Sequence, residues 1–167
     1  MEGRDRDSLE DLRDRCAERM HEALGVEGLD RGAVRASMME SLEFAPFPDV
    51  APALEELKRR GLRLVIASNW DWSLPGWVRD AGLDRFVDGT VSSAVVGAAK
   101  PAPDVFREAL RVAGVASGEA VHVGDSLDGD IGGARAAGLR AILLARQGDP
   151  PEGVESIRSL ADLTALL

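Results

Sequence analysis

Short apolar runs alternate with amphipathic helical segments over the last two thirds of the chain, and this alternation restricts the fold more than any other feature of the sequence. Strands joined by helices of this length require crossover connections, which are right-handed and place the strands in parallel. The sequence therefore predicts a parallel sheet covered by helices on both faces. The expected strands are 62–67, 86–91, 120–123 and 141–144, and the expected helices are 49–60, 73–81, 103–113, 129–137 and 156–166.

The first 45 residues have a different pattern, because apolar residues there recur only at helical spacing. Two helices are expected, at 8–24 and at about 30–42, and the Pro-broken stretch FAPFPDV follows as a linker. Ser8 and Asp11 resemble a capping box at the start of the first helix. Cys16 falls on the apolar stripe of that helix, so we expect a buried structural thiol.

Charge and cysteine content exclude several function classes. The net charge of −9 argues against nonspecific nucleic-acid binding, which needs Lys and Arg to displace counterions from phosphates. A phosphorylated small metabolite stays compatible with that charge, because one lysine and a metal ion can neutralise it locally. The single cysteine allows no internal disulfide, and no apolar run is long enough to span a membrane. The N-terminus has no signal-peptide core, so we expect a cytoplasmic protein.

Polar residues follow three of the expected strands, where a parallel sheet binds its ligands. Ser68 and Asn69 could donate hydrogen bonds to a phosphoryl oxygen, although both are also common turn residues. Lys100 lies in a loop between prolines and could neutralise a phosphate, although most loop lysines are simply solvated. Asp125 and Asp130 are hard oxygen donors suited to Mg²⁺, although Asp130 could equally serve as a helix-capping residue.

Taken together, strand-Ser68, loop-Lys100 and strand-Gly124-Asp125 resemble motifs two, three and four of the haloacid dehalogenase superfamily, in the branch with a helical cap. The resemblance covers residues 46–146, within which AVHVGDSLDGDIGGARAAG is especially similar. It implies a cap remnant at 1–45 and a Rossmann-like α/β core at 46–167. It also implies a Mg²⁺-dependent phosphatase of a small phosphorylated metabolite, acting through an aspartyl-phosphate.

Residue by residue, the resemblance assigns phosphoryl binding to Ser68, with Asn69 beside it, and charge balance to Lys100. Asp125 would ligate Mg²⁺ directly, and Asp130 would support the metal or Lys100. Dehalogenation is the family's other main chemistry, but it works without metal, so the carboxylate-rich loop at Asp125 favours the phosphatase.

The family's first motif, an apolar strand ending in Asp-x-Asp, has no counterpart in the 167 residues. Its first aspartate is the nucleophile, so we expect the chain as written to be inactive, with weak Mg²⁺ binding. Its strand lies centrally, so we also expect segments 62–67 and 120–123 either to be separated by an open gap in the sheet or to shift and pair directly.

Three explanations for the missing motif stay open. They are an upstream start of the reading frame, a binding or regulatory module without catalysis, and half of an enzyme completed by another chain. The module could use the tryptophans at 70, 72 and 77, and the half-enzyme could self-associate through the open gap.

Overall fold

The computed structural model describes residues 2–167 and contains two parallel sheets. In the first, β1 (Val65–Ser68) pairs with β2 (Gly89–Ser92), and Val65 lies opposite Gly89. In the second, β3 (Val121–Gly124) pairs with β4 (Arg140–Leu144), which in turn pairs with β5 (Ser156–Ile157). Every pairing is parallel, which confirms the predicted α/β class with its Rossmann-like arrangement.

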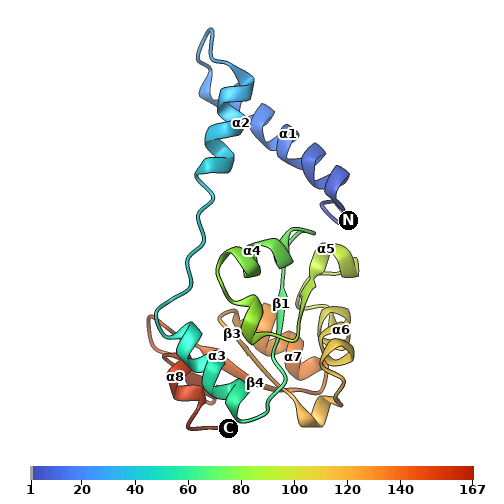
Figure 1. Ribbon diagram of the computed structural model, residues 1–167, viewed down its shortest axis with the longest axis vertical. Coiled ribbons are helices and arrows are strands. Elements are labelled where there is room, and N and C mark those ends of the chain that lie inside the picture. The colour runs from blue at the N-terminus through green and yellow to red at the C-terminus, as the bar shows by residue number, and fades with distance from the viewer. Residues whose placement is uncertain (1) are drawn as a thin grey trace.

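Helices cover both faces of the larger sheet (Figure 1). The side chains of β4 alternate between two cores, as a strand of period two requires. Ile142 packs with Leu57 of α3 (Val50–Arg59) and Leu163 of α8 (Leu160–Leu163). Ala141 and Leu143 pack on the other face, with Phe106 of α6 (Pro103–Ala113) and Ala134 of α7 (Gly133–Ala136). This alternation explains why β4 is almost entirely apolar.

Several segments differ from the sequence-based expectation. The residues expected as one helix at 156–166 begin with β5 and only then form α8. The expected helix at 129–137 is a π-helical turn, η3 (Leu127–Gly132), followed by α7. The remaining elements are α4 (Leu74–Asp80), the unpredicted α5 (Ser93–Val96) and the 3₁₀ turns η1 (Asp84–Phe86) and η2 (Ser117–Glu119).

The two sheets are not joined by backbone hydrogen bonds between β1 and β3 among the described residues. All four residues of each strand are only half-buried. Central strands of a parallel sheet are normally buried on both faces. The expected gap is therefore present, and β1 and β3 have not shifted to pair with each other.

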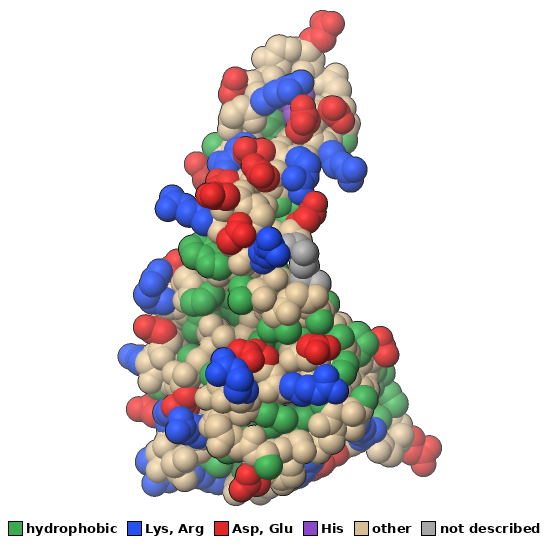
Figure 2. All heavy atoms as spheres, turned by 90° about the vertical axis from the view of Figure 1, so that its right-hand side faces the viewer, with side chains coloured by type: hydrophobic (Ala, Val, Ile, Leu, Met, Phe, Trp, Pro, Cys, Tyr) green, Lys and Arg blue, Asp and Glu red, His purple; other side chains and the backbone are tan. Residues whose placement is uncertain are grey.

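The N-terminal residues form a helical hairpin of α1 (Arg6–Leu24) and α2 (Arg31–Glu40), which extends away from the sheets (Figure 1). Charged side chains of both signs crowd its surface (Figure 2). Arg35 joins the two helices by ion pairs to Glu10 and Asp14. The hairpin also contacts the core through its N-terminal tail, where the Trp72 amide donates to the Gly3 carbonyl at 2.7 Å.

Two predictions about α1 are wrong. Its N-cap is Asp5, whose carboxylate accepts from the Ser8 amide, so Ser8 is the third helical residue of the capping box and not its first member. Cys16 is exposed and not buried. The apolar stripe of α1 faces a cavity between hairpin and core, so its members are not all enclosed. No helix among residues 2–167 is long and apolar enough to cross a membrane.

Candidate active site

Lys100 joins the carboxyl ends of the two sheets. Its Nζ donates to the Ala67 carbonyl of β1 at 3.1 Å and to Oδ1 of Asp130 at 2.5 Å. The lysine side chain is 13% exposed and the aspartate 5%, so the ion pair is largely shielded from solvent. Because such a charge must be held by specific partners to be tolerated, Lys100 is fixed in place and is not a freely solvated loop lysine.

Asp130 is held by three donors. In addition to Lys100, Nε2 of His122 in β3 donates to Oδ1 at 2.8 Å, and the Ser126 amide donates to Oδ2 at 3.0 Å. Burial raises the pKa of Asp130, but the hydrogen bonds from His122, Lys100 and Ser126 outweigh it and hold the pKa well below its ordinary value. The carboxylate is therefore ionised at neutral pH.

Gly124 allows Asp130 to reach this position. A Cβ on Gly124 would lie 2.2 Å from Cγ of Asp130, which no side chain tolerates. The chain then enters η3, where the amides of Asp130 and Ile131 both donate to the Ser126 carbonyl. Such π turns are frequent at functional sites. Here the turn brings Asp130 back over the end of β3.

Asn69 contacts the backbone of Lys100 with both ends of its side chain. Oδ1 accepts from the Lys100 amide at 2.7 Å, and Nδ2 donates to the Lys100 carbonyl at 3.1 Å. Asn69, which the sequence predicts to bind phosphate, thus also connects the loop after β1 to the loop that carries Lys100. Ser68 lies half-buried at the end of β1, one residue from Ala67, whose carbonyl Lys100 contacts.

Asp125 follows β3 directly and is exposed. Both oxygens of Asp130 are already engaged, so Asp125 is the better placed of the two predicted metal ligands. Among residues 2–167 no cluster of three or more His, Cys, Asp or Glu could hold a metal ion by itself. Mg²⁺ usually takes only one or two protein carboxylates, with waters and substrate phosphate completing its shell. The donor chemistry at Asp125 suits that mode.

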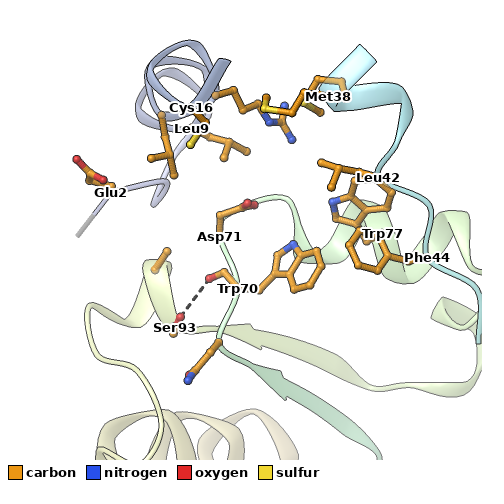
Figure 3. A pocket seen from close by; sticks show the side chains of 15 residues that line it. Glu2, Leu9, Cys16, Met38, Leu42, Phe44, Trp70, Asp71, Trp77 and Ser93 are labelled. Atoms are coloured by element: carbon orange, nitrogen blue, oxygen red, sulfur yellow. Dashed lines mark hydrogen bonds between the residues drawn. The ribbon is translucent and has the colours of Figure 1, made fainter. Parts of the chain in front are cut away.

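A cavity of about 560 Å³ lies between the helical hairpin and the end of β1, and Asn69 forms part of its wall (Figure 3). Trp70, Trp77 and Phe44 line it, with Phe44 edge-on to both tryptophans at 4.9 Å between ring centroids. Trp72 is 47% exposed and does not line it. Of the predicted phosphate-binding residues, Asn69 lines this aromatic-walled cavity, whereas Ser68 and Lys100 do not.

Sequence reasoning missed two features of the site. His122 stands between two valines in the half-buried strand β3, at a position whose side chain usually packs in the core. Its place two residues before Gly124 puts both on one face of β3, and that alternation was the available signal. The hydrogen bonds from Asn69 to Lys100 join residues 31 apart, for which the sequence carries no sign.

Comparison with known proteins places this chain in a family. The family model described as a haloacid dehalogenase-like hydrolase matches residues 4–138. The chain belongs to the haloacid dehalogenase-like hydrolases. It is 37% identical over 123 residues to a phosphatase of Mycobacterium tuberculosis (strain CDC 1551 / Oshkosh). The matched region covers 72% of this chain and 55% of that protein. It is 36% identical over 143 residues to the phosphoserine phosphatase of Thermus thermophilus, covering 83% and 56% respectively.

The structure is also similar to a solved 2-haloacid dehalogenase from Pseudomonas syringae. The TM-score is 0.69 at 29% identity, over 95% of this chain and 70% of the other. Both chemistries of the family therefore occur among the similar proteins. The chain spans about half the length of the first two curated relatives.

Proposed function

We propose that this chain provides the phosphate-binding and metal-binding part of a Mg²⁺-dependent phosphatase that acts on small phosphorylated metabolites. The observation that carries the proposal is the placement of Lys100, which Asp130 holds at the sheet edge beside Ser68. Residues 46–167 form the Rossmann-like core in this proposal, and residues 1–45 are part of a helical cap over the site.

Each residue has a distinct task. The Ser68 hydroxyl donates to a phosphoryl oxygen, and Lys100 offsets the charge of the phosphoryl group while Asp130 fixes its position. Asn69 orients the lysine loop through two hydrogen bonds. Asp125 would hold Mg²⁺, supported by Asp130, and the ion would supply further positive charge to the phosphate oxygens. Because few protein ligands are present, we expect the affinity for Mg²⁺ to be weak.

Phosphate transfer is favoured over dehalogenation by charge. Dehalogenation in this family needs no metal, so an exposed carboxylate directly after β3 has no task in it. In a Mg²⁺-dependent phosphatase, the carboxylate of Asp125 would be a ligand of the metal ion. The exposed position of Asp125 supports the phosphatase.

We expect these 167 residues alone to bind phosphate without turning it over. The carboxylate that contacts Lys100 is Asp130, and both its oxygens accept hydrogen bonds, so it is a poor nucleophile. Loss of the nucleophile from a covalent enzyme lowers turnover by about 10⁶. The test compares hydrolysis of an aryl phosphate by this chain and by a longer chain that includes an upstream Asp-x-Asp strand, each with Mg²⁺ and with chelator.

The two parts of this experiment test the proposed reaction independently of the fold. We expect Mg²⁺-dependent turnover from the longer chain and none above buffer from the 167 residues. Turnover by the shorter chain would show that its nucleophile is already present. An inactive longer chain would refute the phosphatase assignment and leave the α/β fold untouched.

A second candidate function is favoured by the unpaired edges of β1 and β3. Each edge presents backbone donors and acceptors, which readily pair with a further strand. Another copy of the chain, or a separate partner chain, could fill the gap and complete the site. Light scattering at increasing protein concentration tests self-association, and a constant monomer mass would exclude it. The cytoplasmic location stays a prediction.

A further inference from the structure

The cavity beside Asn69 has a chemistry that restricts which phosphate esters it can accept. Its wall is mainly apolar and is formed by the helical hairpin on one side and the loop after β1 on the other (Figure 3). Leu9 of α1 and Met38 of α2 lie on the hairpin side of the space and Trp70 on the side of the core, while Leu42 lies next to Trp77. Leu12 of α1 also lines the cavity. Apolar and aromatic walls of this size are typical of sites that bury the carbon skeleton of a ligand.

The charged groups of the wall do not suit a second anion on the substrate. They are two carboxylates, Glu2 and Asp71, and one guanidinium, Arg13. Arg13 already donates to Glu10 at 2.8 Å, so its charge is largely compensated. Glu2 is likewise paired with Arg15 at 2.6 Å, which leaves Asp71 as the wall carboxylate without a cationic partner among residues 2–167. A ligand carboxylate would therefore lose its hydration on entry and meet Asp71, with no unpaired cation among the described wall residues to replace the water.

One polar group in the wall lacks a partner. Nε1 of Trp70 is buried and has no hydrogen-bond partner among residues 2–167. The matching atom of Trp77 donates to Oγ of Ser73 at 3.0 Å, so the two indoles differ in this respect. Because the Trp70 Nε1 atom is buried, a ligand in the cavity does not reach it in this arrangement of side chains, and it offers no hydrogen bond to a ligand carboxylate.

We propose that this cavity holds the alcohol portion of the substrate and selects phosphate monoesters with an apolar, uncharged body over esters that carry a carboxylate. The inference rests on the proposed function, because it assumes that the phosphoryl group lies at Ser68 and Lys100. The proposal predicts a different substrate from that of the relative named phosphoserine phosphatase, because the carboxylate of phosphoserine has no suitable partner in this cavity. The aromatic wall of Phe44, Trp70 and Trp77 provides the apolar contact.

Binding to the 167-residue chain tests the proposal without requiring turnover. Four probes are titrated by isothermal calorimetry in the presence of Mg²⁺: hexyl phosphate, phosphoserine, inorganic phosphate and 1-hexanol. We expect hexyl phosphate to bind at least tenfold more tightly than either phosphoserine or inorganic phosphate. Phosphoserine binding as tight as that of hexyl phosphate would overturn the proposal.

Two variants locate the effect. Leu42→Lys places a charge in the cavity wall and should abolish the preference for hexyl phosphate, whereas Leu166→Lys, at a similarly exposed leucine near the C-terminus, should preserve it. A preference unchanged by Leu42→Lys would place the apolar site elsewhere and refute the assignment. Thermal melts followed by circular dichroism establish that both variants are folded, and Met38→Lys serves as a second wall variant if Leu42→Lys is not.

The probe set also separates failure of the inference from failure of the proposed function. If 1-hexanol binds as tightly as hexyl phosphate, and Leu42→Lys weakens the binding of both, the result supports the apolar cavity and refutes the phosphate site at Ser68. If inorganic phosphate binds and the hexyl chain adds no affinity, the result supports the phosphate site and refutes the assignment of the cavity to the alcohol portion of the substrate.

Discussion

Replacing Lys100 by methionine removes the ammonium group and keeps most of the aliphatic chain. Asp130 would keep its hydrogen bonds from His122 and Ser126 but lose its ion pair with Lys100. Removing one partner of a buried ion pair typically costs 3–5 kcal/mol. Because His122 still donates to the carboxylate, we expect a loss near the lower limit, about 3 kcal/mol, which corresponds to a fall in Tm of about 6–12 °C for a chain of this length.

A double-mutant cycle isolates the pair. Asp130→Asn alone should cost about 2 kcal/mol, because the amide oxygen can still accept from Lys100 but carries no charge, and the new NH₂ group faces a hydrogen-bond donor where the second carboxylate oxygen was an acceptor. The double variant should cost about 3 kcal/mol, less than the sum of the single losses, which gives a coupling energy of about 2 kcal/mol. Urea unfolding followed by circular dichroism measures all four proteins.

Lys58→Met is the matched control. Lys58 pairs with Asp88 at 2.8 Å, but the side chains are 34% and 22% exposed, so solvent screens the pair more strongly. We expect a cost below about 1 kcal/mol. Equal losses from Lys58→Met and Lys100→Met, or additive losses in the cycle, would refute the view that burial makes the Lys100 pair important.

Three further predictions concern the geometry around the site and the core. Gly124→Ala should destabilise the fold by more than about 2 kcal/mol in thermal melts, because the new methyl overlaps a buried carboxylate, whereas Gly118→Ala, with open space around it, should change little. Asn69→Ala should weaken binding of inorganic phosphate about fivefold in calorimetry, because the Lys100 loop loses two hydrogen bonds; unchanged affinity would contradict this positioning role. Hydrogen bonds from Arg146 and from neighbouring groups lower the pKa of Asp49 to about 2, so its stabilisation of about 1–2 kcal/mol is complete above the unfolded pKa near 4 and is lost as pH falls toward 2. Urea unfolding of Asp49→Asn should therefore differ from the parent at pH 6 and converge with it near pH 2, and a difference independent of pH would contradict the assignment.

Periodicity was sufficient to predict the main elements of the core. The helix at 103–113 was predicted with its observed bounds, because Pro103 begins it and Gly114 ends it in a left-handed conformation. The parallel direction of the strands followed from the helices between them. The short strand Ser156–Ile157 could not be predicted in this way, because two residues have no period and pair only because β4 offers an edge.

The sequence by itself determined which residues follow the strands, and therefore that Ser68, Lys100 and Asp125 belong to one edge of the sheet. Strand direction and alternation are local properties, which neighbouring residues encode. The tertiary structure alone decided which partner each of these groups has. Asp130 contacts Lys100 and His122, and the Trp70 indole has no acceptor among residues 2–167. These outcomes depend on the distance between β1 and β3 and on the position of the helical hairpin, which no local pattern specifies.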